Sequence, residues 1–341
     1  MPPSVTVIAT VLNEGRSIIR LLDSLAAQSR RPDEVIIADG GSTDDTLSLL
    51  QEAAENAVLP LHVIDCPGSN ISQGRNAAIE VAAGDVIAVT DAGVRLTERW
   101  LEELVAPFEQ DDVDAVSGFF VPDAQTVFEV AMGATVLPDR SDVRPERFLP
   151  SSRSVAFRKS AWRAVGGYPE WLDYCEDLVY DLRLRDRFGP FAFAPQALVR
   201  FRPRPNLRAF YVQYYRYARG DGKADLWRKR HAIRYGTYLI AAPLLIYLVL
   251  WHSPLWLLAL AAGVAAYTNT PYRRLCRAMK GLSWTEKLYA VLLVPCIRVV
   301  GDVAKMIGYP AGWLWRVQHR QEIPDWRQVG PDRSTNGHDD L

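Results

Sequence analysis

Hydrophobic residues occur in short blocks separated by polar residues through about the first 120 positions of the chain. Apolar residues at helical spacing between the blocks predict helices. Strands that are apolar along their whole length and alternate with helices are typical of a sheet covered on both faces. The pattern therefore predicts an α/β domain with a largely parallel sheet flanked by helices. Its predicted strands are Val5–Val11, Glu34–Asp39, Leu61–Ile64, Asp85–Thr90 and Ala115–Val121.

The pattern changes in the second half of the chain. The 38 residues from Tyr235 to Tyr272 include no Asp, Glu, Lys or Arg. Because one membrane span needs about 20 residues, this stretch predicts a hairpin of two short spans with its bend near Pro254. A buried core hairpin is the alternative, and the Trp and Tyr residues near its ends favour the membrane.

Basic residues flank the hairpin and predict its orientation. Since positive residues are retained on the cytoplasmic side, both ends of the hairpin and the N-terminal domain are predicted to be cytoplasmic. The chain is thus predicted to be a multi-pass protein of the cell membrane, in contact with the lipid bilayer. The flanking residues are Arg228, Lys229, Arg230 and Arg234 on one side and Arg273, Arg274, Arg277 and Lys280 on the other.

A further apolar segment, at about 285–309, places Arg298, Asp302, Lys305 and Tyr309 on one helical face. This predicts an amphipathic helix lying in the membrane interface, with a third span as the alternative. The polar residues beyond it predict a disordered tail. The predicted domains are a cytosolic domain at 1–225, a C-terminal α-helical membrane-associated region at 226–320, and the tail at 321–341.

Composition and charge exclude several classes of protein. The chain has 341 residues, of which 49% are hydrophobic, enough to fill a sizeable core. A net charge of −1 argues against a nucleic-acid partner. The 4 cysteines have no CxxC spacing and predict free thiols. Because the chain opens on a strand pattern, we expect no signal peptide.

Polar side chains follow three of the predicted strands at the point where each strand ends. Asn13 and Glu14 follow the first, Asp39 and Ser42 the second, and Asp91 the fourth. Any one of them alone is more often a cap or turn residue. Ligands of parallel sheets bind beyond the carboxyl ends of the strands, so together they indicate a binding site. The first turn lacks G-x-G-x-x-G, which argues against a dinucleotide dehydrogenase.

Five segments, in this order, resemble the inverting family 2 glycosyltransferases, which have a GT-A fold. The resemblance implies an enzyme that moves a sugar from a nucleotide-sugar donor to an acceptor at the cytosolic membrane face. The acceptor would be lipid-linked, for example a polyprenyl carrier, or a nascent glycan. The segments are "VIATVLNEG", "DEVIIADGGSTDDT", "GRNAAIEVAAGDVIAVTDA", "AVGGYPEWLDYCEDLVYDLRLR" and "QYYRY".

The resemblance also implies roles for individual residues. Asp39 falls at the position that contacts the base, and Arg75 at a basic position near the nucleotide. A surface arginine at a helix N-terminus is an equally weighted alternative for Arg75. Tyr217 stands where the membrane-embedded relatives have Trp, so a role in chain extension is not implied. The implied donor-binding residues are Thr10, Asn13, Glu14, Asp39, Ser42, Arg75, Asp91, Gln213 and Arg216.

Asp91 matches the first acid of the family's Asp-x-Asp motif, which holds Mg²⁺ or Mn²⁺ against the diphosphate. The second acid is replaced by Gly93. A metal ion on Asp91 alone is one possibility. The other is that arginines carry part of the leaving-group charge, so that the dependence on metal is reduced. The candidate arginines are Arg95, Arg200, Arg202 and Arg216.

Glu176 and Asp177 form a second acidic pair. The resemblance implies that Asp177 is the general base, with Glu176 next in line. An acidic helix N-terminus is the alternative, and both interpretations can hold together. The long polar loop 138–158 between the two acidic sites is interpreted as an acceptor-side lid or as a plain surface loop.

Two rival functions remain to be weighed. A sugar-nucleotide pyrophosphorylase has a related sheet, but it needs a glycine-rich phosphate loop after the first strand, and none is present. A catalytically degenerate, membrane-tethered nucleotide-sugar-binding protein is the other rival, and Gly93 is its motivation.

Overall fold

The computed structural model describes residues 3–110 and 112–327, which form two compact units. The first unit comprises the described residues up to 121, residues 143–201 and residues 321–327. Its strands are β1 (Val5–Val11), β2 (Glu34–Asp39), β3 (Leu61–Asp65), β4 (Val86–Val89), β5 (Val94–Leu96), β6 (Ala115–Pro122), β7 (Val155–Arg158) and β8 (Ala192–Phe201). Its helices are α1 (Ser17–Ala26), α2 (Thr46–Glu55), α3 (Ile71–Val81), α4 (Trp100–Val105), α6 (Lys159–Ala164) and α7 (Glu176–Phe188).

The strands form one sheet in the order β3-β2-β1-β4-β7-β6-β8-β5. The pairs β1–β2, β1–β4 and β2–β3 are parallel, whereas β4–β7, β6–β7 and β5–β8 are antiparallel. The α/β prediction is confirmed, and the sheet is mixed, with its parallel pairs in the first half. Strand β7 lies inside the loop predicted at 138–158, so the end of that segment is sheet core and not a lid.

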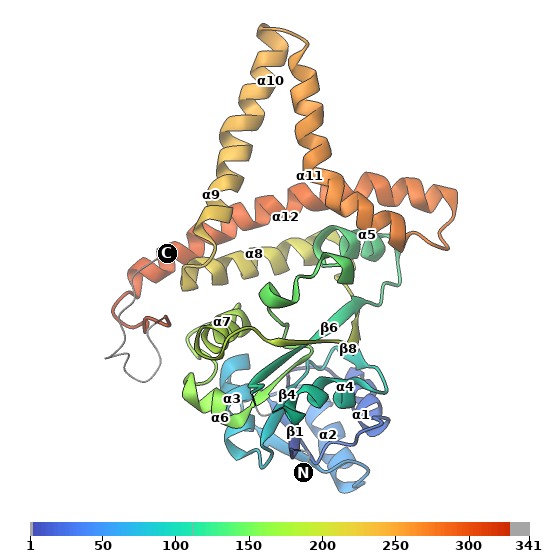
Figure 1. The fold of residues 1–341 in the computed structure, drawn as a ribbon, viewed down its shortest axis with the longest axis vertical. Helices are drawn as coiled ribbons and strands as arrows, with labels where there is room; N and C mark the ends of the chain where they lie inside the picture. The colour runs from blue at the N-terminus through green and yellow to red at the C-terminus, as the bar shows by residue number, and fades with distance from the viewer. Residues whose placement is uncertain (1–2, 111, 328–341) are drawn as a thin grey trace. The chain divides into compact units, whose positions relative to one another are not determined.

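Alternate residues of β1 pack on opposite faces of the sheet. Val5 and Val7 belong to the core cluster that includes residues of α1, α2 and α4. Ile8 belongs to the cluster formed with α3, α6 and α7. Because both faces are covered, β1 is mostly apolar, as its sequence predicts (Figure 1).

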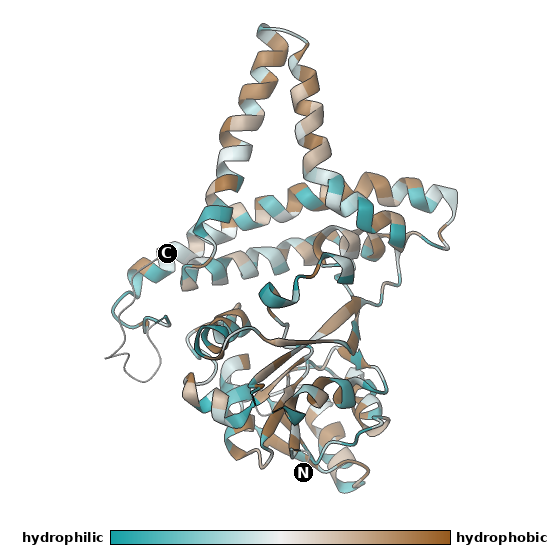
Figure 2. Cartoon of the chain, viewed as in Figure 1, coloured by the Kyte–Doolittle hydropathy of each residue, from teal (hydrophilic) through white to brown (hydrophobic). Residues whose placement is uncertain are grey.

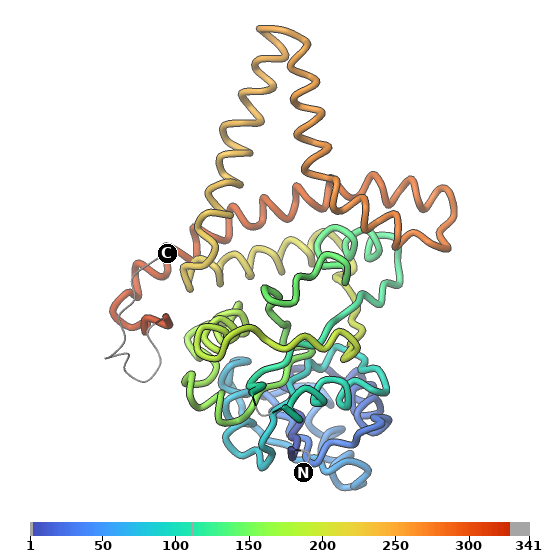
Figure 3. Tube along the Cα trace, viewed as in Figure 1, coloured from blue at the N-terminus to red at the C-terminus, as the bar shows by residue number. Residues whose placement is uncertain are grey.

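The second unit is helical and comprises residues 122–142 and 202–320. Helices α8 and α12 run side by side along most of the length of α8 (Figure 3). A Cβ atom added at Gly312 would lie 2.0 Å from the Arg219 carbonyl oxygen, and one at Gly308 would lie 2.3 Å from that of Tyr215. Glycine is therefore required where these helices touch. The helices of the unit are α5 (Val127–Val136), α8 (Leu207–Ala224), α9 (Arg228–Gly236), α10 (Ala242–Trp251), α11 (Trp256–Ala278) and α12 (Trp284–Gln318), and the π-helical turn η4 (Thr237–Ala241) joins α9 to α10.

Helices α10 and α11 form the predicted hairpin, and its surface is largely apolar (Figure 2). Among the described residues, one helix is long and apolar enough to cross a membrane, namely Arg228–Trp251. None of its most apolar stretch is buried within the structure. The returning helix α11 carries arginines near its C-terminal end and does not qualify as a second span. Of the two predicted membrane spans, only the first, Arg228–Trp251, therefore has a matching helix among the described residues.

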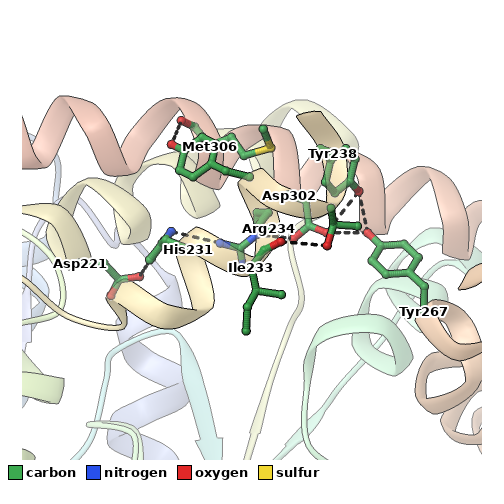
Figure 4. Close-up of polar contacts among 10 residues, drawn as sticks. Asp221, His231, Ile233, Arg234, Tyr238, Tyr267, Asp302 and Met306 are labelled. Carbon is green, nitrogen blue, oxygen red and sulfur yellow. Dashed lines mark hydrogen bonds and ion pairs between the residues drawn. The ribbon is translucent and has the colours of Figure 1, made fainter. Parts of the chain in front are cut away.

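A polar network fixes the base of the hairpin to α12 (Figure 4). Arg234 Nε donates to Asp302 Oδ1 at 2.8 Å, and the hydroxyl of Tyr267 donates to Asp302 Oδ2 at 2.6 Å. The residues predicted to share one face of α12 therefore face other helices of this unit. The opposite face is apolar and exposed, with Leu292 60% and Ile307 51% exposed.

The two units do not follow the predicted domain boundaries. Helix α8, predicted within the 1–225 domain, belongs to the helical unit. The predicted disordered tail begins with described residues that belong to the sheet-containing unit. There Trp326 is buried, and its carbonyl oxygen accepts a hydrogen bond from Arg183 Nε at 3.2 Å. The prediction of disorder therefore fails at Trp326, and residues 328–341 lie outside the described part of the chain.

Candidate active site

The ends of β1 and β2 are interlocked by side chains that were predicted to bind the donor. Strand register pairs Val11 with Asp39, which brings the two ends together. The Asn13 N–H donates to Ser42 Oγ at 2.8 Å, and the Thr43 N–H donates to Asn13 Oδ1 at 2.8 Å. Asn13 adopts a left-handed backbone with φ of 55°, which asparagine tolerates. These contacts shape the loop edge at which a ligand would bind.

Asp39 is fully buried at the end of β2. Its Oδ1 accepts hydrogen bonds from the N–H groups of Gly41 at 2.8 Å and Ser42 at 2.6 Å. Its Oδ2 is buried with no hydrogen-bond partner in the described structure. Leaving a buried acceptor unpaired is unfavourable, and an N–H donor from a bound ligand would satisfy it.

Glu14 and Thr10 have structural partners at the end of β1. The Glu14 carboxylate accepts a hydrogen bond from the Ser17 hydroxyl at 2.7 Å, at the start of α1. A Cβ atom added at Gly74 would lie 3.0 Å from Thr10 Cγ2, so the glycine lets α3 approach β1. Helix α3 is thereby brought close enough to the strand ends for its next residue to enter the site.

Arg75, the residue after Gly74 on α3, is 2% exposed and forms ion pairs with two acidic residues. Its guanidinium contacts Glu176 Oε1 at 3.0 Å and Asp91 Oδ1 at 3.2 Å. Burial by itself would lower the pKa of Arg75, but the carboxylates, Glu176 foremost, raise that pKa above its usual value. The alternative of a surface arginine is therefore wrong. Arg75 joins the end of β4 to the start of α7.

The two acids at the start of α7 have different surroundings. Glu176 is buried against Arg75, and burial together with the charge of Asp177 raises the pKa of Glu176 to about 7, against the opposing effect of Arg75. Asp177 is only partly buried, and its Oδ1 accepts a hydrogen bond from the Leu178 N–H at 2.8 Å. Cys175, just before them, has φ of 64°, a strained conformation of the kind that clusters at functional sites. Of the two acids, Asp177 is the one that can reach a ligand.

The residues around Asp91 do not fit the two-acid metal site that the resemblance implies. Gly93 offers no ligand, and each Asp91 oxygen faces a guanidinium group, Arg75 at 3.2 Å and Arg153 at 3.8 Å. Within residues 3–110 and 112–327, no cluster of three or more His, Cys, Asp or Glu side chains is arranged to hold a metal ion. A Mg²⁺ or Mn²⁺ ion would find a single carboxylate that already has cationic partners.

The remaining predicted residues lie elsewhere. Arg95 and Arg200 are directly paired across β5 and β8. Arg202 contacts Glu129 at 2.9 Å within the helical unit. Gln213 and Arg216 lie on α8 of that unit, where Gln213 Nε2 donates to the Tyr217 hydroxyl at 2.7 Å.

Arg153 was not among the residues predicted from the sequence. It lies in the polar loop before β7, and its Nε is 3.8 Å from Asp91 Oδ2. In the sequence "PSSRS" nothing distinguishes it from other loop arginines. The contact depends on the antiparallel pairing of β7 with β4, which the apolar pattern did not predict.

Comparisons with known proteins identify the family to which this chain is similar. A family profile described as "Glycosyl transferase family 2" matches residues 6–161, and one described as "Glycosyl transferase family group 2" matches residues 86–297. The O-antigen chain rhamnosyltransferase WbaN of Salmonella anatum is 26% identical over 226 residues, covering 61% of this chain and 70% of WbaN. The succinoglycan biosynthesis protein ExoA of Rhizobium meliloti (strain 1021) is 28% identical over 253 residues, covering 70% of this chain and 75% of ExoA.

A solved structure has a similar fold. The mannosyltransferase PcManGT from Pyrobaculum calidifontis, in complex with GDP-Man and Mn²⁺, has a TM-score of 0.55 and 20% sequence identity. The match covers 90% of this chain and 88% of PcManGT. At this identity the likeness establishes the fold, and the mixed sheet flanked by helices is therefore GT-A-like.

Proposed function

Because the chain belongs to glycosyltransferase family 2, and so uses a nucleotide-sugar donor, we propose that it is a membrane-anchored inverting enzyme with Asp177 as its general base. One observation carries this assignment. Arg75 binds Glu176 and Asp91 together in a buried ion-pair system, and Asp177 stands beside it with its carboxylate accessible. Buried ion pairs fix geometry, and an accessible carboxylate next to them is positioned to accept a proton.

The proposed reaction is a single displacement. The acceptor hydroxyl oxygen attacks the anomeric carbon while the bond from that carbon to the β-phosphate oxygen breaks. The bonding electrons leave with the nucleoside diphosphate, and the hydroxyl proton passes to the Asp177 carboxylate. Attack from the side opposite the leaving group inverts the anomeric configuration.

Donor binding is proposed at the edge formed by β1, β2 and β4. The unpaired Oδ2 of Asp39 would accept a hydrogen bond from an N–H of the base. Asp91 would contact the ribose, and Arg75 would hold Asp91 in place. Gln213 and Arg216 are proposed to act on the donor from α8, on the strength of their motif alone.

We place the enzyme at a membrane through its apolar hairpin. Leu239 is 64% and Leu250 65% exposed on the arm Arg228–Trp251. Removing one such side chain from water is worth about 1.5–3 kcal/mol, so a lipid environment is strongly favoured. The basic residues at the start of this arm support the proposal that this end of the arm is cytoplasmic. An acceptor that is a lipid-linked or growing glycan fits this location, and the names of WbaN and ExoA concern polysaccharides.

A degenerate nucleotide-sugar-binding protein is the second candidate, and Gly93 is the observation that favours it. Such a protein would bind the donor without turnover. Both candidates predict donor binding, and only the enzyme predicts release of the nucleoside diphosphate.

A thermal-shift screen tests the shared premise of donor binding. The full chain in detergent is melted with UDP, GDP, CDP, ADP or dTDP, each with EDTA or with Mn²⁺. A nucleotide that binds the folded state at about 100 times its Kd stabilises that state by about 2.7 kcal/mol and raises Tm. We expect one base to give the largest shift and Asp39→Asn to reduce it. If no nucleoside diphosphate raises Tm in either condition, the proposed function is wrong.

A further inference from the structure

We propose that Arg153 binds the donor diphosphate beside Asp91, where the family's second acid would otherwise bring in a metal ion. This inference rests on the proposed function. It makes Arg153 a donor-binding residue that also stabilises the leaving group. It further implies that the enzyme binds nucleoside diphosphates without a divalent cation.

The loop that carries Arg153 is tied directly to the end of β4. The carbonyl oxygen of Arg153 accepts a hydrogen bond from Thr90 Oγ1 at 3.0 Å. Its NH1 group donates to Ser151 Oγ at 2.9 Å within the same loop. The backbone of Arg153 is therefore held next to the residue that precedes Asp91.

The Arg153 side chain contacts the Phe201 ring and approaches Asp91. Its guanidinium lies over the Phe201 ring, 4.5 Å from the centroid, and 3.8 Å from Asp91 Oδ2. Phe201 is the strand partner of Val94, the residue that follows Gly93. A Cβ atom added at Gly93 would meet no other atom within 4 Å. The position of the missing acid is therefore open, and Arg153 is linked to the same stretch of chain through Asp91 and through Phe201, the partner of Val94.

The chemistry of this arrangement suits an anion. Asp91 contacts two guanidinium groups, of which Arg75 is shared with Glu176 and Arg153 approaches the other Asp91 oxygen. A guanidinium presents planar paired donors that match phosphate oxygens. A divalent cation at the same place would be repelled by Arg153. Stacking on Phe201 also limits the side-chain freedom that Arg153 would lose on binding.

Binding measurements on the full chain in detergent test the proposal. Of UDP, GDP, CDP, ADP and dTDP, the two with the largest thermal shifts are titrated by calorimetry in EDTA and again in Mn²⁺, using wild type, Arg153→Ala and Arg153→Lys. Arg99→Ala is the matched control because Arg99 is 63% exposed and pairs with Glu102 on the surface of the same unit. A hydrogen bond to a charged group is worth about 1.5–3 kcal/mol, so we expect Arg153→Ala to raise Kd in EDTA about 10- to 100-fold.

A variant designed to restore metal binding tests whether Arg153→Ala weakens nucleotide binding only by disturbing the fold. Gly93→Asp restores the second acid into open space, and Gly93 has no positive φ that would strain the new side chain. We expect the double variant Gly93→Asp/Arg153→Ala to bind weakly in EDTA and to recover in Mn²⁺. Arg153→Lys keeps the charge but lacks the planar fork, and we expect an intermediate Kd.

The outcomes distinguish a failure of the Arg153 proposal from a failure of the proposed function on which it rests. Wild-type binding in EDTA within about threefold of that in Mn²⁺, lost in Arg153→Ala and kept in Arg99→Ala, supports it. Wild-type binding that requires Mn²⁺, or an Arg153→Ala variant that binds as wild type does, overturns it and leaves the proposed function standing. Absence of binding by wild type to either nucleotide, together with no shift for any nucleotide in the thermal screen, overturns both.

Discussion

At the scale of single residues, the site is organised around one buried arginine. Arg75 shares its guanidinium between Glu176 and Asp91, which come from different elements. Removing one partner of a buried ion pair costs about 3–5 kcal/mol, because the other charge is left unpaired. Arg75 therefore holds Glu176 and Asp91 in place, next to Asp177, which we propose as the general base.

Glu176 makes the stability of the fold depend on pH. Its pKa is about 7 in the folded protein against 4.5 for an ordinary glutamate. Below pH 4.5 the Glu176 carboxyl is protonated in both the folded and the unfolded state, and its contribution to the stability of the fold is complete. Between pH 4.5 and pH 7 Glu176 ionises in the unfolded chain but keeps its proton in the folded protein. Its contribution to stability is therefore lost as pH rises. We expect the Tm of wild type, relative to Glu176→Gln, to fall from pH 5 to pH 8.

Melting curves at four pH values in one detergent measure this effect. The comparison with Glu176→Gln removes the contributions of all other groups that titrate in both proteins. Parallel curves for the two proteins across this range would show that Glu176 does not titrate as its buried position requires.

The sequence was sufficient to name the candidate residues at the strand ends, but it was insufficient to predict the contacts of the arginines. Asp39 and Asp91 could be found because each lies at the end of a strand that the apolar pattern marks, whereas Asp177 was named through the family resemblance. The partners of Arg75 and Arg153 lie far away in the chain, and no local pattern encodes a contact of that kind. Gly93 was visible as a missing acid, but the contact of Arg153 with Asp91 was not.

At the scale of elements, the packing of α8 on α12 depends on glycine. We expect Gly312→Ala to destabilise the helical unit, because its Cβ would lie 2.0 Å from the Arg219 carbonyl oxygen and the two helices would have to separate. Overpacking of this kind costs about 1–3 kcal/mol. Tm in detergent is the measurement.

Gly263→Ala on α11 is the matched control for this prediction. Its Cβ would meet no other atom within 4 Å, and alanine is the better helix former by about 0.5–1 kcal/mol. We expect its Tm to equal or exceed that of wild type. A Gly312→Ala variant as stable as Gly263→Ala would contradict the close packing of the two helices.

The predicted elements were accurate where burial covers both faces. Strands β1 and β2 have the bounds that their apolar runs predict. Strands β5 and β7 were missed because they are short, with one arginine each, and β8 was missed as well. Their antiparallel pairing is set by tertiary contacts and leaves little trace in local sequence.

At the scale of the whole molecule, the account requires a membrane. We expect wild type to stay in the membrane fraction after carbonate extraction. Two lysines in the apolar arm, Leu244→Lys with Leu248→Lys, should release it, since each charge near the centre of a span costs about 2.5–3.5 kcal/mol.

Ile233→Lys serves as the control for the membrane prediction. Ile233 lies in the basic first turns of the arm and is 69% exposed, so a lysine there can reach the interface. Retention of this variant and loss of the double variant are the expected results. Wild-type protein in the carbonate supernatant would contradict the membrane anchor.

The division of the chain is the feature that the sequence predicted least well. The apolar stretch marked the hairpin, but nothing in α8 announced that it packs on α12 and belongs to the helical unit. The return of Trp326 to the sheet-containing unit was also missed, because a single tryptophan in a polar tail carries no periodic signal.

Release of nucleoside diphosphate from nucleotide sugars tests the central claim most directly, with water standing in for the acceptor. Full-length wild type, Asp177→Asn and the control Asp186→Asn, an exposed acid on the same helix, are compared on a panel of donors. The account predicts equal release by wild type and Asp186→Asn, and release about 10²- to 10⁴-fold slower by Asp177→Asn with nucleotide binding retained. Turnover by Asp177→Asn at the wild-type rate, or binding without release by wild type, would contradict it.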